Sequence, residues 1–280
     1  MRWLRTACVL FCAGLLLGSS GCRRFSRLRH KPVHRAVRGP RLMAPLPMSM
    51  RVDKIETPHF EPAAVFVPLG TRWARPVVIA IHGQNESPEM ACNAWSSITN
   101  RDYFVLCPEI GVTRSENGAK ASCNSVECLA DELREALVAL RQRFGRYVAP
   151  KEVMLVGRAS GAARAVPIAL QNPAVFSAVW LVDGGLREWS SAVSVAYATR
   201  GGKFVGLACE GSSCGSEAQR VKTSAGMAGL LTAFVNSGSG GSIWDAESVK
   251  AIRLSWQRAK PAGWPWAVPG RSEHTTRPDG

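Results

Sequence analysis

Apolar segments that alternate with helix-forming segments constrain the fold of this chain more than any other feature. The clearest helix-forming segment is 127–145, in which Leu129, Leu133 and Leu137 recur at helical spacing. The apolar segments are 63–69, 75–83, 103–109, 152–157, 176–185 and 202–210. Most of them are apolar throughout, which is typical of strands buried on both faces. The pattern therefore predicts an α/β fold, with a mostly parallel central sheet and helices on both faces.

Two further helices are expected from the same pattern. One follows the strand 152–157 directly and covers residues 160–173. The other covers residues 221–238 and ends at Gly238, and Gly145 suits the C-cap of the helix 127–145. The predicted α/β domain covers residues 61–258, and residues 259–280, rich in Pro and Gly, form an irregular tail.

The first 21 residues have the pattern of an export signal. Arg2 and Arg5 precede an apolar run from Ala7 to Leu17, and small residues follow up to Cys22. The run is too short to span a bilayer comfortably as a helix. Small residues directly before a cysteine resemble the lipobox of bacterial lipoproteins, which implies acylation at Cys22 and an envelope location, with the protein facing the periplasm or the exterior. An ordinary secretory signal is the alternative.

The net charge of +14 is concentrated near the N-terminus. The segment from Arg23 to Lys54 holds ten Lys and Arg residues and one acid, Asp53. Residues 22–60 therefore predict a basic, Pro-containing tether that contacts acidic lipid headgroups. Export argues against nucleic acid as a partner.

The cysteines agree with export. Three of the nine lie in the first 22 residues, and the other six form an even set suited to disulfides in an oxidising compartment. Their spacing suggests local pairs, namely Cys92–Cys107, Cys123–Cys128 and Cys209–Cys214. No pair has the C-x-x-C spacing of a zinc or redox site and no histidine is close in sequence, so we expect no metal and no cofactor.

The segment "VMLVGRASGAARAV", residues 153–166, predicts a strand, a tight turn and a helix. In hydrolases this turn is written G-x-S-x-G, with a serine nucleophile at the apex. Gly157 and Gly161 keep the flanking positions, but the apex is Ala159 and a serine, Ser160, follows it. A second motif, His82-Gly83, ends the strand 75–83 and is followed by Gln84.

These motifs, in this order, resemble the α/β-hydrolase superfamily, and within it secreted esterases such as dienelactone hydrolases and poly(3-hydroxybutyrate) depolymerases. The Cys92 and Cys107 pair also resembles the depolymerase-like branch. The resemblance covers residues 61–258 and places the nucleophile at Ala159. It implies that His82, Gly83, Gln84 and Ser160 shape the oxyanion pocket, with Arg158 at its mouth.

The resemblance also implies an acid and a histidine after the elbow. Only His274 follows it, in the polar tail, and Ser242 stands where the family has its histidine. Glu210 is the only acid in the turn after the strand 202–210, and Asp183 is an alternative acid. A further alternative is an acid/base pair of Glu109 and Asp183, both at strand ends.

The sequence therefore favours an exported, lipid-anchored protein that has lost serine-hydrolase activity. Its expected role is binding an ester, a saccharide or a peptide, or acting as an envelope interaction module. One alternative is an active esterase or depolymerase-like hydrolase with Ser160, Asp183 and His274. In that case Ser160 is a shifted nucleophile rather than a residue that bonds nearby backbone at the helix start. Another is a structural envelope protein that acts through its basic tether.

Overall fold

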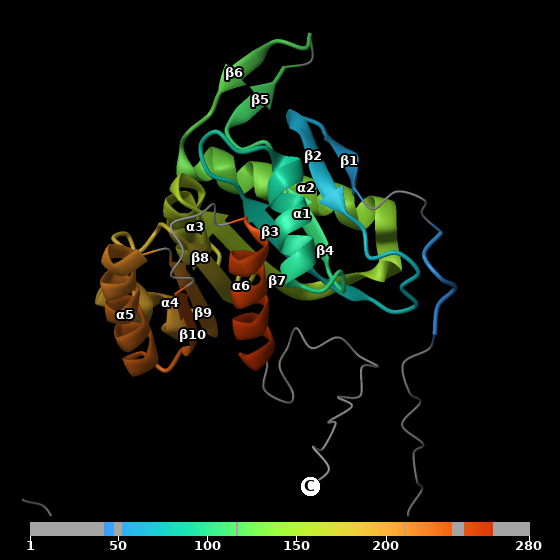
Figure 1. The fold of residues 1–280 in the computed structure, drawn as a ribbon. Coiled ribbons are helices and arrows are strands. Elements are labelled where there is room, and N and C mark those ends of the chain that lie inside the picture. The colour runs from blue at the N-terminus through green and yellow to red at the C-terminus, as the bar shows by residue number, and fades with distance from the viewer. Residues whose placement is uncertain (1–41, 48–51, 116, 210, 237–243, 260–280) are drawn as a thin grey trace, which may run out of the picture. The chain divides into compact units, whose positions relative to one another are not determined.

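A mixed, mostly parallel sheet organises the protein (Figure 1). The computed structural model describes residues 42–47, 52–115, 117–209, 211–236 and 244–259, all within the unit 40–280. The strands are β1 (Val52–Thr57), β2 (Phe60–Phe66), β3 (Arg75–Ile81), β4 (Phe104–Cys107), β5 (Val112–Arg114), β6 (Lys120–Ser122), β7 (Val148–Arg158), β8 (Ala178–Val182), β9 (Phe204–Cys209) and β10 (Leu231–Asn236). The helices are α1 (Pro88–Ile98), α2 (Val126–Phe144), α3 (Ser160–Gln171), α4 (Ser191–Thr199), α5 (Gly211–Met227) and α6 (Ala246–Arg258), with a short 3₁₀ turn at Gly145–Tyr147.

The strand order is β10-β9-β8-β7-β3-β4-β2-β5-β6, with β1 paired to β2. The strands from β10 through to β4 are parallel to their neighbours, and β1, β2, β5 and β6 are added antiparallel. The chain order reverses between β3 and β7, which lie side by side. In open α/β sheets, ligands bind outside the strand ends at such a switch point.

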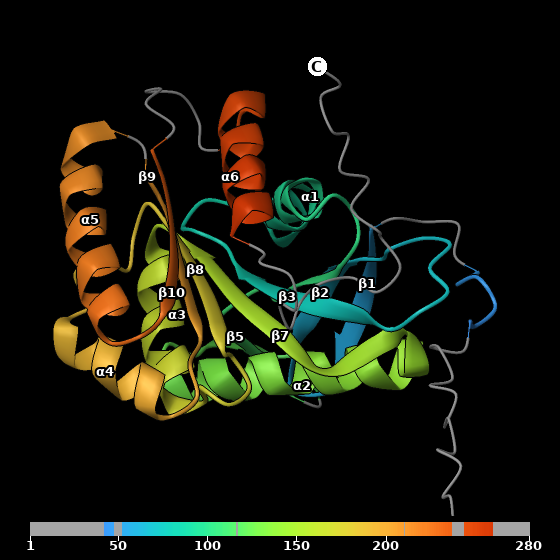
Figure 2. The same cartoon turned by 90° about the horizontal axis from the view of Figure 1, so that it is seen from below.

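Helices cover both faces of the sheet, as predicted (Figure 2). Successive residues of a strand point to opposite faces. Val77 and Ile79 of β3 pack in the core under α2 to α5, and Val78 packs with α1 and α6. The second core is rich in aromatic rings, including Trp95, Trp180 and Trp256, all fully buried. Both faces of the central strands are therefore dry, which accounts for their uniformly apolar sequences.

Polar caps set several helix starts. The side chains of Ser87, Ser125, Ser190 and Asp245 each accept a hydrogen bond from a backbone N–H in the first turn of α1, α2, α4 and α6. Gly145 ends α2 with a positive φ of 50°, as expected for its C-cap position. The helix α3 differs, since its N-cap residue Ala159 has no side-chain cap.

The sheet begins before residue 61, where the sequence placed the start of the α/β domain. β1 is an edge strand in which only Ile55 and Thr57 are buried, and its exposed positions carry charges such as Lys54 and Glu56. Charged side chains are common on edge strands. Because of these charges, the segment Val52–Thr57 has the composition of the basic tether, and its sequence did not indicate a strand.

The helix expected over 221–238 is wrong in its second half. α5 ends at Met227, and Gly229, with φ of 84°, turns the chain into the strand β10. Leu231–Asn236 pairs with β9 through its backbone. Thr232, Phe234 and Val235 are residue types that favour strands, so sheet pairing overrides the helical spacing.

The three expected disulfides are present in the structure. Cys92–Cys107 joins α1 to the end of β4, and Cys209–Cys214 joins the end of β9 to the first turn of α5. Across the described parts of the chain, no helix has the length and hydropathy needed to cross a membrane.

Candidate functional site

A sharp turn between β7 and α3 holds the apex residue Ala159. Its φ and ψ are 48° and −118°, a conformation that residues with a side chain rarely adopt. The Ala159 N–H donates to the carbonyl of Val182 on β8, at 2.8 Å. The sharp strand-to-helix turn that the sequence predicted is therefore present, and its apex carries a methyl group.

Two glycines allow this turn to lie close to its neighbours. A Cβ on Gly157 would lie 2.6 Å from the backbone of Gly161 and Ala162. A Cβ on Gly161 would lie 2.4 Å from the carbonyl oxygens of both Ile81 and His82. Because those atoms belong to the backbone, they cannot rotate away. The glycines expected at the flanks of the elbow thus pack α3 against the end of β3.

The Ser160 side chain points to the loop after β3. Its Oγ accepts a hydrogen bond from the N–H of Gln84 at 3.0 Å. Ser160 is exposed and is the first residue of α3. The serine does bond backbone, as one of the two interpretations expected, but the partner lies across the switch point rather than in its own helix.

The Glu86 side chain also fixes the loop after β3. Its Oε2 accepts the N–H of Gly83 at 2.8 Å, and its Oε1 accepts the indole N–H of Trp244 at 3.2 Å. Its side chain is 7% exposed and forms an ion pair with Arg158. The Arg158 guanidinium also lies over the Trp244 ring, 5.7 Å from its centroid. Arg158, which the resemblance placed at the mouth of the oxyanion pocket, therefore faces Glu86 and Trp244, and its charge is compensated by Glu86.

His82 shapes the turn through both ring nitrogens. Nδ1 lies 2.9 Å from the carbonyl oxygen of Gly83, and Nε2 lies 3.0 Å from that of Glu109. The backbone carbonyl of Glu109 is thus a contact of the His82 ring, and Glu109 itself is an exposed residue. Because a neutral imidazole has one N–H, the ring donates to one of these two carbonyl oxygens at a time.

A buried carboxylate fixes the next loop. Glu132 on α2 is 1% exposed and accepts the N–H groups of Ile110 and Gly111, each at 2.9 Å. Burial raises the pKa of Glu132, and the two backbone N–H donors oppose that shift. Ile110 and Gly111 both have positive φ. Glu132 therefore stabilises a strained connection after β4, at the same end of the sheet as the elbow.

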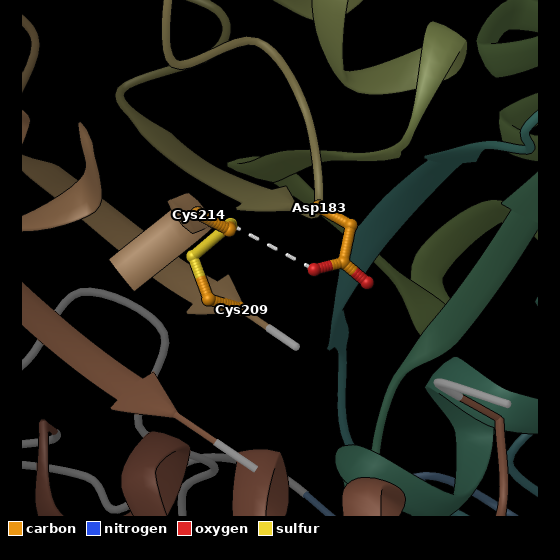
Figure 3. Close-up of side chains that lie close together, drawn as sticks. All are labelled: Asp183, Cys209 and Cys214. Carbon is orange, nitrogen blue, oxygen red and sulfur yellow. Dashed lines mark hydrogen bonds between the residues drawn. A yellow bond between two sulfur atoms is a disulfide. The ribbon is translucent and has the colours of Figure 1, made fainter. Parts of the chain in front are cut away.

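Asp183 ends β8 beside the Cys209–Cys214 disulfide (Figure 3). Its φ is 49°, and its Oδ1 lies 3.8 Å from the Sγ of Cys214. These three side chains converge closely enough to surround an ion. Both sulfur atoms are bonded to each other, however, and a disulfide sulfur is not the thiolate that a metal site requires. We therefore read the group as a disulfide packed against a loop carboxylate.

A cavity of about 340 Å³ lies beside the ends of β7 and β8 and the N-terminal part of α5. Ala159 and Asp183 both line it, with Gly184, Gly185 and Leu186. Its charged lining residues are Asp183, Arg187, Glu188 and Glu217, and Arg187 forms an ion pair with Glu217. Glu109 does not line this cavity. The structure thus brings Asp183 to the elbow but does not bring the expected alternative pair of carboxylates into one cavity.

Several predicted residues lie outside the described part of the chain: Cys22, Glu210, Ser242 and His274. Within the described ranges the histidines are His59 and His82. His59 is exposed and its ring lies 2.9 Å from the Glu135 carboxylate. Neither of these two imidazoles forms a hydrogen bond with the Ser160 hydroxyl, which accepts the N–H of Gln84.

Sequence reasoning missed Glu86, Glu132 and Trp244. A glutamate three residues after Gly83 was a readable local signal, since this spacing lets a carboxylate reach back to the N–H. Glu132 resembled an exposed charge of an amphipathic helix. Its backbone partners lie more than 20 residues away in sequence, and no local sequence pattern predicts such contacts.

Comparison with known proteins gives a fold and no sequence relative. No family model matches the chain, and no curated protein matches it by sequence. Among solved structures, a predicted CIB-like hydrolase from Thermoplasma acidophilum aligns with a TM-score of 0.52 at 14% identity, over 76% of this chain and 98% of that one. The fluorophosphonate-binding serine hydrolase F of Staphylococcus aureus gives 0.53 at 9% identity, over 75% and 98%. An S-formylglutathione hydrolase from Staphylococcus aureus gives 0.52 at 11%, over 76% and 98%. The sheet, its helices and these likenesses together show that the chain has the α/β-hydrolase fold.

Proposed function

We propose that this protein is a non-catalytic member of the α/β-hydrolase fold that binds a ligand in the cavity beside its elbow. The observation that carries the proposal is the elbow itself, in which Ala159 holds the strained apex conformation. A methyl group neither attacks a carbonyl nor donates a proton. Loss of the nucleophile in a serine hydrolase costs on the order of a millionfold in kcat.

The position of Ser160 supports the proposal against a shifted nucleophile. Its hydroxyl oxygen accepts the Gln84 N–H, and neither imidazole of the described residues, His59 or His82, bonds this hydroxyl. A serine without a hydrogen-bonded base is barely nucleophilic near neutral pH. The competing hydrolase would need a base for Ser160, and the candidate, His274, lies outside the described residues.

The cavity supports a binding role. At about 340 Å³ it lies within the size range of small-molecule sites. Its wall combines the Ala159 methyl group, the Gly184–Gly185 backbone and charged side chains. An ester, a small saccharide or a peptide end fits this mixture of apolar and polar surface.

Labelling with a fluorophosphonate probe tests the loss of activity. The probe reacts with an activated serine, so we expect no labelling of the folded wild-type protein. Ser160→Ala and Ala159→Ser are compared beside it. Labelling of the wild type that disappears in Ser160→Ala would establish a shifted nucleophile and overturn the proposal.

The N-terminal segment supports a second element of the proposal, attachment to a bacterial membrane. Acylation at Cys22 would supply one anchor, and the basic tether a second, since a single acyl chain binds membranes only marginally. We expect the protein expressed in bacteria to carry lipid on Cys22 and to fractionate with membranes. Mass spectrometry of the N-terminal peptide, with Cys22→Ser as control, measures this, and an unmodified, soluble wild type contradicts it.

Ten basic residues between Arg23 and Lys54 favour one further candidate, a structural envelope protein that acts through its tether. Deleting residues 23–41 separates the two roles. If the tether alone carries the function, this deletion abolishes localisation or partner binding, and substitutions in the cavity have no effect. If the cavity carries it, cavity substitutions remove ligand binding while localisation persists.

A further inference from the structure

We infer that Ser160 occupies the oxyanion site of this fold with its own hydroxyl group, so that the protein is blocked at a second place besides its missing nucleophile. The inference rests on the proposed function in one respect, since it takes Ala159 as the apex of the elbow. It adds that the Ser160 hydroxyl keeps a substrate oxygen out of the oxyanion site, and that Ser160 is not a leftover catalytic residue.

The position of the oxyanion site follows from the backbone. In this fold the developing negative oxygen is bound by the N–H of the residue after the nucleophile and by an N–H from the loop after the third strand. The first of these residues is Ser160 itself. The second comes from the loop between β3 and α1, residues 82–87. The loop and the elbow are in contact, since a Cβ built on Gly83 would lie 3.4 Å from the Ala159 methyl carbon.

Two N–H groups of that loop are already used. The Gln84 N–H donates to Ser160 Oγ at 3.0 Å, and the Gly83 N–H donates to Glu86 Oε2 at 2.8 Å. Oxyanion donors lie about 2.7 to 3.1 Å from the oxygen that they stabilise. The Ser160 hydroxyl oxygen therefore lies at the distance from Gln84 at which a substrate oxygen would have to lie.

The loop is held so that it cannot easily open around the hydroxyl. Glu86 ties it to Arg158 on β7 and to Trp244 before α6. The Glu86 side chain is 7% exposed and that of Arg158 is 22% exposed, so water screens this pair weakly. His82 attaches the start of the loop to the Glu109 carbonyl. A carbonyl ligand would therefore have to displace Ser160 Oγ from a loop that is fixed on both sides.

The consequence concerns the kind of ligand that the cavity accepts. A ligand held as a hydrolase holds its substrate would place its acyl oxygen between the two donors. With one donor occupied, we expect the ligand to contact the wall formed by Asp183, Gly184 and Leu186 instead. Acyl carbonyl recognition at the elbow is thus replaced by recognition at the end of β8.

A cysteine at the apex makes the inference measurable, because a thiol needs an added base less than a serine does. In Ala159→Cys, reaction with p-nitrophenyl acetate forms a C–S bond, breaks the ester C–O bond and releases p-nitrophenolate. The thiol proton goes to solvent, and the intermediate carries an oxyanion. Reaction with iodoacetamide forms a C–S bond with loss of iodide and creates no oxyanion. The ratio of the two rates therefore reports on the oxyanion site and cancels differences in thiol access.

The experiment compares Ala159→Cys with Ala159→Cys/Ser160→Ala in the full-length chain. Peptide mass spectrometry assigns each product to position 159, which separates it from Cys8, Cys12 and Cys22. Removing one oxyanion donor from a hydrolase costs about 100- to 1000-fold. We expect the alanine to free Gln84 and to raise acetylation about tenfold or more. Alkylation by iodoacetamide should stay within about twofold, because that reaction makes no use of the oxyanion site.

Two further variants keep the outcome interpretable. Ala159→Cys/Ser160→Thr retains a hydroxyl, so its acetylation should remain as slow as that of Ala159→Cys. Ala159→Cys/Ser190→Ala removes a serine hydroxyl that accepts the Val193 N–H at the N-cap of α4, and should also stay slow. Equal acetylation with and without the Ser160 hydroxyl overturns the inference. A parallel rise in acetylation and alkylation overturns it as well, since that result indicates steric shielding. The proposed loss of activity is tested separately, because it is contradicted by fluorophosphonate labelling of the wild type and not by these rates.

Discussion

The two sides of the sheet's carboxyl edge differ in what occupies the space outside the strand ends. At the switch point between β3 and β7, the loop N–H groups of Gly83 and Gln84 bond to Glu86 and Ser160. Between the end of β8 and the N-terminal part of α5, by contrast, the chain leaves a cavity lined in part by charged side chains. We call the first region the closed side and the second the open side.

The difference separates what the fold needs from what chemistry needs. The elbow glycines pack α3 against β3, so the turn is required whether or not a nucleophile stands at its apex. A catalytic side chain has no such packing role, and its loss leaves the core unchanged. The closed side thus keeps the backbone geometry of the α/β-hydrolase fold, and the open side is where we propose that a ligand binds.

The strongest way to break the closed side is Gly161→Ala. The new Cβ would lie 2.4 Å from two backbone oxygens, so we expect the free energy of unfolding to fall by more than about 3 kcal/mol. Gly226→Ala is the matched control, since a Cβ there meets nothing within 4 Å in α5. It should raise stability by about 0.5 to 1 kcal/mol. Urea unfolding measures both, and a harmless Gly161→Ala would show that the elbow is not fixed by its packing.

Removing disulfides compares the open side with the neighbouring contact between α1 and β4. Cys92–Cys107 encloses a longer loop than Cys209–Cys214, with sequence separations of 15 and 5. Loop-closure entropy predicts losses of about 3 and about 2 kcal/mol for the double serine variants. Thermal unfolding without reductant measures them. The Cys209–Cys214 variant should also alter ligand binding, because Cys214 lines the cavity. A larger loss on the open side would contradict the entropic account.

The sequence predicted the central fold because local and global signals agree there. Uniformly apolar strands and the 127–145 leucine spacing point to one architecture, and the local cysteine pairs close where short spacing allows. The prediction failed at β10, where helical spacing in 221–238 competed with sheet pairing that only the partner strand β9 supplies. It also failed at β1, whose exposed charges resemble a tether.

The backbone turns of the candidate site could be predicted from the sequence, but its side-chain contacts could not. Gly157, Gly161 and the His82-Gly83 turn are local motifs, so their geometry could be read from the chain. The bond from Gln84 to Ser160 spans 76 residues and depends on the direction of one side chain. Likewise, the pairing of Arg158 with Glu86 shows only once β3 and β7 are placed side by side.

Glu132→Gln tests the loop support next to the closed side. An amide can accept only one of the two N–H bonds that Glu132 receives, so we expect a loss of about 1 to 2 kcal/mol. Glu135→Gln is the control on the same helix, since its exposed partner His59 contributes little, and it should cost less than about 0.5 kcal/mol. Urea unfolding of the two variants gives the comparison.

The same substitution has a pH signature. Burial raises the folded-state pKa of Glu132 above its ordinary value of 4.5. The resulting stabilisation is present below pH 4.5 and is lost as the pH rises through the folded-state pKa. Glutamine does not titrate, so the stability difference between wild type and Glu132→Gln should be largest below pH 4.5 and should decrease as the pH rises through the folded-state pKa. A difference that grows toward neutral pH would show that the pKa is lowered instead.

The smallest expected effect concerns Ser160, and it distinguishes an occupant of the site from a structural cap. Ser190→Ala removes an N-cap bond to Val193 N–H and should cost about 1 kcal/mol. Ser160→Ala removes a bond of similar length at an exposed position, where water can reach the freed Gln84 N–H, and should cost less than about 0.5 kcal/mol. Urea midpoints measured side by side resolve the two. If Ser160→Ala costs as much as Ser190→Ala, the serine is part of the framework of the closed side. If it costs little, the hydroxyl has a small effect on the fold and its main consequence is to deny the Gln84 N–H to a ligand.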